Sequence, residues 1–454
     1  MTIQEYFEKN KDNFINQLIE FLKIPSISSE PQHKDDIRRC AEWLYNNIKN
    51  SGIDNVRIIE TEGHPIVYAE NLEAGEDKPT ILFYGHYDVQ PVDPLELWNS
   101  NPFEPVINNG KLFARGSSDD KGQVFMHIKS IESYLKSNNK LPLNIKFLIE
   151  GEEEAGSNHL DEFIYKNKEL LQCDSVLISD TEWFSDNVPS LCYSLRGIAY
   201  FEVTITGPNR DLHSGTFGGA VDNPIMILSK MISKLKDEYG RITIPDFYEN
   251  VLPLEDDERE NFLRLPFNEK NWLKDLDILY SYGEIGYSIL ERTWARPSLD
   301  INGIYGGYTG EGAKTVLPSK ATAKISMRLV PNQEPEEIIN KTKKYLEQLL
   351  PPTAKMEFKA LHGGKPVLIQ RNGKEVQSAM AALKKTYNVD PVFMREGGSI
   401  PVVNTFTQVL NAPVILMGFG LPGDNVHSPN ESFSLDNFFG GIKTSINFID
   451  EYSK

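Results

Sequence analysis

The chain has 454 residues, more than a single hydrophobic core usually holds, so we expect two domains. Its formal net charge of −18 argues against nucleic acid and anionic membrane surfaces as partners. The chain has three cysteines and no Cys-x-x-Cys pair, which favours free thiols in a reducing compartment over a disulfide framework.

The N-terminus carries neither the basic region nor the apolar region of a signal peptide. No apolar run approaches the ~18 residues that span a bilayer. We therefore expect a cytoplasmic protein with no membrane partner.

An α/β domain is predicted from the two ends of the chain. Apolar residues at helical spacing predict helices up to about Asn50, and strands then alternate with helical patterns from Val56 to Asp180. Short apolar runs predict buried strands at residues 80–84, 145–149 and 175–179. A helix at 376–387, a strand at 413–416 and a helix at 437–451 return the chain to this domain. We assign it residues 1–195 and 365–454.

The segment between these parts, residues 196–364, has a different pattern. Residues 200–206 alternate with period two, and similar strands are expected around 299–303, 321–330 and 355–361. Helices are expected at 224–235 and 335–350. These elements predict an inserted α+β domain with a four-stranded antiparallel sheet and two helices. Residues 245–297 within it are acidic and aromatic and have no clear period.

Acidic residues and histidines follow the predicted strands. In open α/β sheets, ligands bind at the carboxyl ends of strands, so loops that follow several strands converge on one site. The candidates are two histidines and three carboxylates: His86, Asp119, Glu154, Asp180 and His427. Alone, a His-x-Asp pair is no more than a hydrogen-bonded loop pair, and a run of glutamates is usually a solvated cluster.

Together these five side chains are too many for one tetrahedral zinc with an open position. They suit two ions about 3.5–4 Å apart that share a carboxylate, and such ions lower the pKa of a shared water toward ~7. Asp88 can orient His86 through its second ring nitrogen. Glu153, next to Glu154, can serve as a general base that does not bind metal.

Four motifs make the pattern specific. They are Gly85-His86-Tyr87-Asp88-Val89-Gln90-Pro91, the run Arg115-Gly116-Ser117-Ser118-Asp119-Asp120-Lys121-Gly122, Glu152-Glu153-Glu154-Ala155-Gly156-Ser157, and Ile178-Ser179-Asp180. In this order they resemble the di-zinc metallopeptidase-20 family, which includes aminoacylase, carboxypeptidase G, a desuccinylase and carnosinase-type dipeptidases. The resemblance implies a mixed-sheet catalytic domain with helices on both faces, interrupted by a lid domain that usually dimerises.

The resemblance also implies a role for each residue. His86 and Asp180 would hold one metal ion, Glu154 and His427 the other, and Asp119 would bridge them. A cis peptide bond often follows the bridging aspartate in this family. The ions would most often be Zn²⁺, with Mn²⁺ or Co²⁺ as alternatives.

Further motifs resemble the cytosolic non-specific dipeptidases most closely. They are Asp211-Leu212-His213-Ser214-Gly215, Ala313-Lys314-Thr315-Val316-Leu317-Pro318, Arg328-Leu329-Val330-Pro331-Asn332 and Arg395-Glu396-Gly397-Gly398-Ser399. In that branch His213 and Thr315 would act across a homodimer, and His213 would stabilise the oxyanion. Arg328 would bind the terminal carboxylate of a small peptide, and Gly398 and Ser399 would line the pocket. The alternative interpretations are that His213 is a histidine in a turn and that Arg328 forms an ion pair at the surface.

Three functions remain open at this point. A metal-dependent dipeptidase is favoured by the lid segment and the Arg-Glu-Gly-Gly-Ser motif. An N-acyl-amino-acid amidohydrolase or a carboxypeptidase would use the same metal chemistry with a different pocket. A non-catalytic binding protein with this fold should lack a ligand or the base, and none is missing here.

Overall fold

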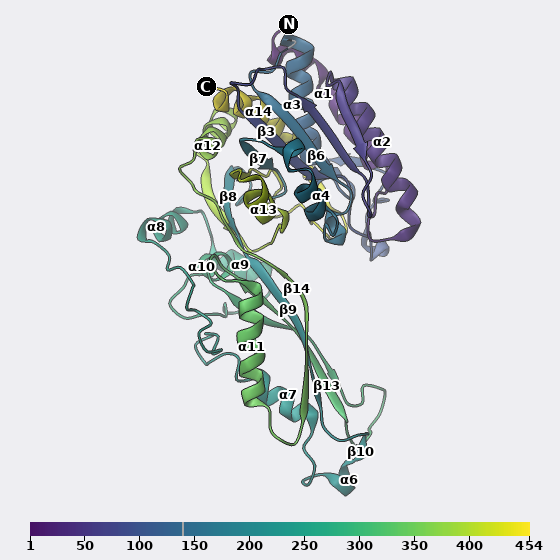
Figure 1. Ribbon diagram of the computed structural model, residues 1–454, viewed down its shortest axis with the longest axis vertical. Coiled ribbons are helices and arrows are strands. Elements are labelled where there is room, and N and C mark those ends of the chain that lie inside the picture. Colours follow the sequence, from purple (N-terminus) through teal and green to yellow (C-terminus); the bar gives the residue numbers. More distant parts are fainter. Residues whose placement is uncertain (139) are drawn as a thin grey trace. The chain divides into compact units, whose positions relative to one another are not determined.

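The computed structural model describes residues 1–138 and 140–454, apart from the side chain of residue 138 (Figure 1). It forms two compact units. The first contains Met1–Tyr193, Ile369–Met394 and Val402–Lys454, and the second contains Ser194–Leu368 and Arg395–Pro401. The loop Arg395–Pro401 therefore packs with the inserted segment although the chain on either side of it belongs to the first unit.

The first unit is built on a mixed sheet whose strand order is β1-β2-β6-β3-β7-β17-β8-β15, with β16 paired to β8, and the last strand of this order, β15, belongs to the residues of the second unit. Strands β6, β3, β7 and β17 are parallel neighbours, while β1, β2 and β8 pair antiparallel. The strands are β1 (Asn55–Ile59), β2 (Ile66–Asn71), β3 (Thr80–His86), β6 (Asn144–Glu150), β7 (Ser175–Ile178), β8 (Ser190–Leu195), β15 (Val367–Leu368), β16 (Val392–Glu396) and β17 (Val414–Leu416). A separate small sheet joins β4 (Val106–Asn108), β5 (Lys111–Phe113) and β18 (Ser432–Ser434).

Helices cover both faces of the main sheet. Adjacent residues of a strand point to opposite faces. On β3, Phe83 contacts His127 of α3 on one face, with ring centroids 4.9 Å apart, and Tyr84 contacts Phe406 of η4 on the other, at 5.2 Å. The helices are α1 (Ile3–Leu22), α2 (Lys34–Ser51), α3 (Lys121–Asn138), α4 (Leu160–Lys166), α5 (Lys168–Leu171), α12 (Lys374–Tyr387), α13 (Val402–Thr405) and α14 (Leu435–Tyr452), with short turns η1 (Pro31–His33), η2 (Leu95–Leu97), η3 (Glu153–Ala155) and η4 (Phe406–Leu410).

Local sequence signals set the ends of several helices. Thr2 and Glu5 form a reciprocal capping box at the start of α1. Gly52 ends α2 in a left-handed conformation with φ 110°, which glycine adopts without a steric penalty. The mixed α/β fold and the helices on both faces confirm the sequence-based prediction. Among the described residues, no helix combines the length and the apolar character needed to cross a bilayer.

The second unit contains the predicted four-stranded antiparallel sheet, in the order β11-β13-β9-β14. On β9, every second residue from Ala199 to Ile205 is buried, and this face packs against α7 and α11, the two expected helices. The bounds are β9 (Gly197–Thr206), β10 (Leu212–His213), α6 (Ser214–Phe217), α7 (Pro224–Ile232), β11 (Ser298–Gly306), β12 (Val316–Leu317), β13 (Lys320–Leu329), α11 (Pro335–Leu349) and β14 (Lys355–Gly364).

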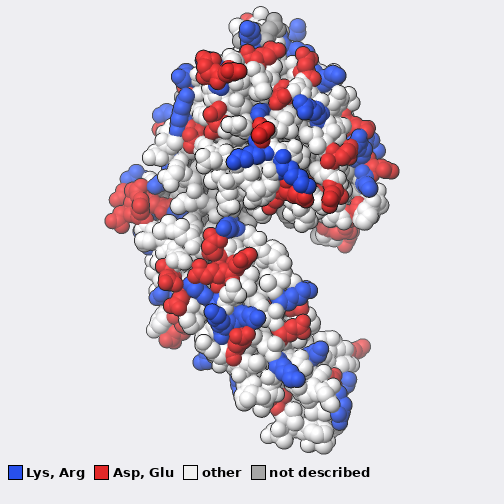
Figure 2. All heavy atoms as spheres, viewed as in Figure 1, with Lys and Arg blue, Asp and Glu red and all other residues white. Residues whose placement is uncertain are grey.

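The segment without a clear sequence period contains three further helices: α8 (Asp256–Arg264), α9 (Glu269–Asp275) and α10 (Ile289–Trp294). They are short, six to nine residues each, which is why no helical period stands out in the sequence. Figure 2 shows acidic side chains gathered over α8, whose first turn contains three acidic residues in succession.

Candidate metal centre

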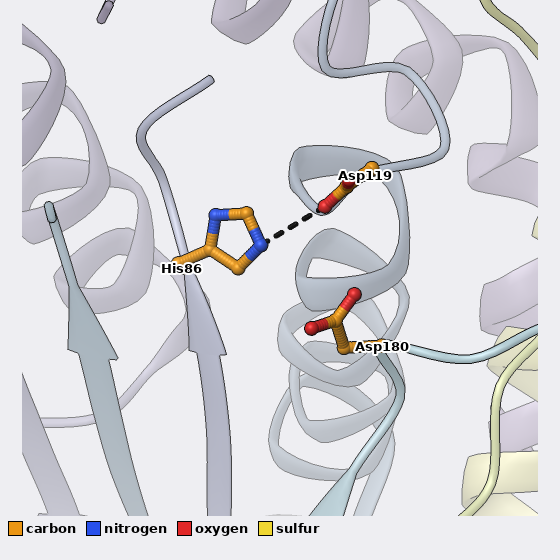
Figure 3. Close-up of side chains that lie close together, drawn as sticks. All are labelled: His86, Asp119 and Asp180. Carbon is orange, nitrogen blue, oxygen red and sulfur yellow. Dashed lines mark ion pairs between the residues drawn. The ribbon is translucent and has the colours of Figure 1, made fainter. Parts of the chain in front are cut away.

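The carboxyl ends of two parallel strands bring the first candidate ligands together. Strand β3 pairs with β7, so the residues that end them lie at the same edge of the sheet. His86 is the last residue of β3, because the pairing of β3 with β6 continues to His86 opposite Glu150. The strand is therefore two residues longer than predicted. Asp180 follows β7, and Asp119 lies in the loop that precedes α3 (Figure 3).

The five predicted ligands form two groups that share Asp119. One group is His86, Asp119 and Asp180, and the other is Asp119, Glu154 and His427, and within each the ligand atoms lie within 4.8 Å of one another. The two oxygens of Asp119 face different histidines. Oδ1 lies 3.0 Å from His86 Nε2, and Oδ2 lies 2.8 Å from His427 Nε2. This is the arrangement that a bridging carboxylate requires.

The donor set fits divalent cations. His86 Nε2 is buried and has no partner with hydrogen-bond geometry in the described chain, although Asp119 Oδ1 is close. Burial, reinforced by neighbouring carboxylates, raises the pKa of Asp180 well above its ordinary value. Such crowding of buried acids is relieved by a cation, which is often the largest local charge in a site. Imidazole nitrogen and carboxylate oxygen are ligands that Zn²⁺ accepts.

Asp88 connects the two sides of the site. Its backbone carbonyl lies 3.1 Å from His86 Nδ1, and its Oδ1 lies 3.4 Å from the same nitrogen. A proton held on Nδ1 leaves Nε2 free to bind metal. The Asp88 carboxylate also accepts hydrogen bonds from the amides of Glu153 and Glu154, at 3.2 and 3.0 Å. Asp88 therefore positions both His86 and the turn η3.

Glu153 and Glu154 have different surroundings although they are adjacent in η3. Glu154 Oε2 lies 3.3 Å from His427 Nε2 and accepts a hydrogen bond from Gln90 at 2.7 Å. The Glu153 carboxylate makes no hydrogen bond or ion pair with another described residue. Burial raises the pKa of Glu153 to about 7. Only Glu154 is thus grouped with the other ligands.

Glu431 is a positioning residue that the sequence reasoning missed. Its buried carboxylate accepts hydrogen bonds from the amides of Gly116, Ser118 and Asp119, at 2.9, 2.9 and 3.1 Å, and from Arg115 Nη1 at 2.8 Å. It therefore holds the loop that carries the shared ligand. The peptide bond between Asp119 and Asp120 is cis, as the resemblance implied. The available signal for Glu431 was its position four residues after His427.

The remaining predicted site residues belong to the second unit. His213 is exposed on β10, pairs with Val316 of β12, and accepts a hydrogen bond from the Gly215 amide at its Nδ1. The carbonyl of Thr315 accepts a hydrogen bond from the Ser214 amide at 3.1 Å, so Thr315 lies beside His213.

Arg328 and Ser399 are also brought together in this unit. Arg328 Nη1 donates to Ser399 Oγ at 3.1 Å. Gly398 lies beside Ser399, and a Cβ added there would meet no atom within 4 Å. The predicted substrate residues thus form two pairs, His213 with Thr315 and Arg328 with Ser399.

Two groups of candidate metal ligands lie at the strand ends of a mixed α/β sheet, beside a glutamate that pairs with no other described residue, and this arrangement is that of a metal-dependent hydrolase. The chain belongs to peptidase family M20/M25/M40, whose sequence profile matches residues 82–451. It is therefore an enzyme, a metallopeptidase.

Similar proteins cover the chain almost completely. The chain is 33% identical to the Cys-Gly metallodipeptidase DUG1 of Saccharomyces cerevisiae, over 98% of this chain and 96% of the yeast protein. It is 30% identical to the Beta-Ala-His dipeptidase of Rattus norvegicus, over 99% and 95% of the two chains. The solved structure of the metallo-carboxypeptidase Sso-CP2 from Sulfolobus solfataricus is similar with a TM-score of 0.84, 33% identity, and coverage of 97% of this chain and 99% of that one.

Proposed function

We propose that the enzyme hydrolyses the amide bond of dipeptides or short peptides that have a free C-terminal carboxylate. The observation that carries the proposal is the placement of Asp119 between His86 and His427, which fits a two-metal site. Relatives named as dipeptidases, aligned over nearly the whole chain, support the substrate class.

Two divalent ions are proposed as cofactors. His86 and Asp180 would hold one, Glu154 and His427 the other, and Asp119 both. Bound ions would polarise the substrate carbonyl and lower the pKa of an attacking water. Zn²⁺ is the proposed metal, and Mn²⁺ and Co²⁺ are alternatives because nitrogen and oxygen ligands accept all three.

Glu153 is proposed as the general base. Its carboxylate makes no hydrogen bond or ion pair with another described residue. Its chain neighbour Glu154 lies against His427, so Glu153 is next to the proposed ligands. It would accept the proton of the water and donate it to the leaving amine. Asp88 would keep the His86 ring and the η3 turn in place.

We further propose that residues 1–195 and 365–454 act as the catalytic domain and residues 196–364 as a lid that dimerises. His213 would stabilise the oxyanion across a homodimer, with Thr315 beside it. Arg328 would bind the substrate carboxylate in a pocket lined by Gly398 and Ser399, and the Arg328–Ser399 hydrogen bond supports this grouping. A cytoplasmic location is proposed because Cys40, Cys173 and Cys192 form no disulfide bond.

The second candidate is a carboxypeptidase, favoured by the similarity to Sso-CP2. An N-acyl-amino-acid amidohydrolase would use the same residues. The test is metal content by elemental analysis together with hydrolysis rates on dipeptides, tripeptides, longer peptides and N-acyl amino acids. The proposal expects about two metal ions per chain and the highest kcat/KM for dipeptides. Cleavage of acyl amino acids without cleavage of dipeptides would overturn it.

A further inference from the structure

Arg196, in the second unit, has a guanidinium that makes no ion pair with any of the described residues. Its Nε atom is buried and has no hydrogen-bond partner in the described part of the chain. Burial lowers the pKa of Arg196 to about 10, and the positive charge of Arg328 adds to this effect. Asp300 acts in the opposite direction, but it is exposed and accepts a hydrogen bond from Ser298. A buried charge without a partner is costly, so such a group calls for an explanation.

Arg196 directly precedes β9, close to Arg328 of the neighbouring strand β13. Arg328 of β13 pairs with Ile198 of β9, and Arg196 lies two residues before Ile198, just outside the strand. Diagonal neighbours on paired strands lie about 7–8 Å apart, and the positive charge of Arg328 acts on Arg196. The two arginines are therefore close enough to contact one small anion from two sides.

The loop with the Arg-Glu-Gly-Gly-Ser motif completes this cluster. Ser399 Oγ accepts a hydrogen bond from Arg328 Nη1 and donates one to the backbone carbonyl of Arg196. A Cβ added to Gly397 would lie 2.7 Å from Arg196 Nη2, so glycine allows the guanidinium to lie against the loop. At Gly398 an added Cβ would meet no atom within 4 Å, which leaves room for a ligand.

We propose that Arg196 is a second substrate-binding arginine, which shares the C-terminal carboxylate of the peptide with Arg328 and Ser399. This inference rests on the proposed function. An ionised carboxylate accepts at about four lone-pair positions, so it can pair with two guanidinium groups at once. A carboxamide offers one acceptor oxygen and two donor hydrogens, which the arginines cannot satisfy. The cluster therefore selects peptides with a free carboxylate over peptide amides.

The experiment compares an alanyl-glycine analogue that has an uncleavable CH₂–NH linkage with its C-terminal carboxamide. Affinities are measured by calorimetry on the metal-loaded enzyme, and kcat/KM is measured for alanyl-glycine and alanyl-glycinamide. The variants are Arg196→Met and Arg196→Lys. Arg241→Met is the matched control, because Arg241 is an exposed arginine of the same unit that packs over Tyr248.

The wild-type enzyme should prefer the carboxylate, and Arg196→Met should reduce that preference about 10- to 100-fold, the size of a hydrogen bond to a charged group. The preference of Arg196→Lys for the carboxylate should lie between those of the wild type and Arg196→Met. The preference of Arg241→Met should match that of the wild type. An unchanged preference in Arg196→Met overturns the inference. An equal loss of affinity for the carboxylate and the carboxamide also overturns the inference, because a purely structural role of Arg196 would weaken the binding of both to the same extent.

The failure of this inference is distinguishable from the failure of the proposed function. If the wild type hydrolyses no peptide, the proposed function is wrong, and the binding preference still decides the role of Arg196. If the wild type hydrolyses dipeptides and Arg196→Met keeps its discrimination, only the role of Arg196 is wrong.

Discussion

The side chain of Glu431 accepts a hydrogen bond from the backbone amide of Asp119, at 3.1 Å, although 312 positions separate them in the chain. The same carboxylate binds Arg115 and two further amides of that loop. The proposed shared ligand, Asp119, is thus held by a residue that lies four positions after another proposed ligand, His427. Loss of these hydrogen bonds should weaken metal binding by both groups of candidate ligands, because both contain Asp119.

The Glu431→Gln variant should bind metal about 10- to 100-fold more weakly, because residues that hydrogen-bond the loops around a metal site orient its ligands. Glutamine has one acceptor oxygen where glutamate has two, so it cannot accept all the hydrogen bonds that hold the loop of Asp119. Competition with a chelator measures the dissociation constants. Glu20→Gln is the control, since Glu20 is an exposed acid of the same unit. Equal metal affinity in Glu431→Gln and wild type would contradict the role given to Glu431.

The Glu153→Gln variant should keep its metal but lose turnover by about 10²–10⁴-fold, because a positioned acid–base group contributes this much. Glu154→Gln provides the contrast and should lose metal as well, since Glu154 lies 3.3 Å from His427 Nε2. Elemental analysis and kcat measured on the same samples separate the two effects. Unchanged turnover in Glu153→Gln would show that Glu153 is not the base.

A mixture of two inactive variants tests the proposed action of His213 across a dimer. If His213→Ala subunits exchange with Glu153→Gln subunits, each mixed dimer should regain one complete site of its two. The mass of the mixed species verifies exchange, and the recovered rate is compared with that of each parent. Absence of recovery after proven exchange would place His213 and Glu153 in the same subunit's site.

His127 should make stability depend on pH. It is buried between Ser179 and Ser445, and burial lowers its pKa to about 3, below the ~6.5 of an unfolded chain. As pH falls below about 6.5, the unfolded chain binds a proton that the folded chain does not, so stability is full above this pH and declines toward pH 3. The decline that is due to His127 should approach about 1.4 kcal/mol per pH unit.

The measurement is the midpoint of urea unfolding at pH 7.5, 6.5 and 5.5 for wild type and His127→Gln, both saturated with metal. Glutamine does not titrate, so the wild-type midpoint should fall more steeply than that of the variant. Protonation of the metal ligands affects both proteins and cancels in the difference. Parallel pH dependences would mean that His127 is not held neutral.

Much of the first unit was predictable from the sequence because its signals are local. The strands of the parallel layer are mostly apolar, and β6, β7 and β17 lie within one residue of their predicted positions. The helices α8 to α10 were not predicted, because helices of six to nine residues contain too few turns for a clear period. The end of β3 was missed because it depends on pairing with β6, not on the residues of β3 alone.

The sequence by itself determined the chemical types at the site: two imidazoles, three carboxylates and a glutamate beside one of them, at strand ends and in loops. The family resemblance implied how they are grouped, but the physical cause of the grouping lies in the tertiary structure, because the order β6-β3-β7-β17 sets which strand ends are neighbours and the two oxygens of Asp119 face different histidines. The tertiary structure also decided the places of Glu431 and Arg196. Glu431 contacts backbone amides and Arg115 more than 300 positions away, and Arg196 is affected by the like charge of Arg328 on another strand; contacts between such distant positions leave no pattern in the sequence.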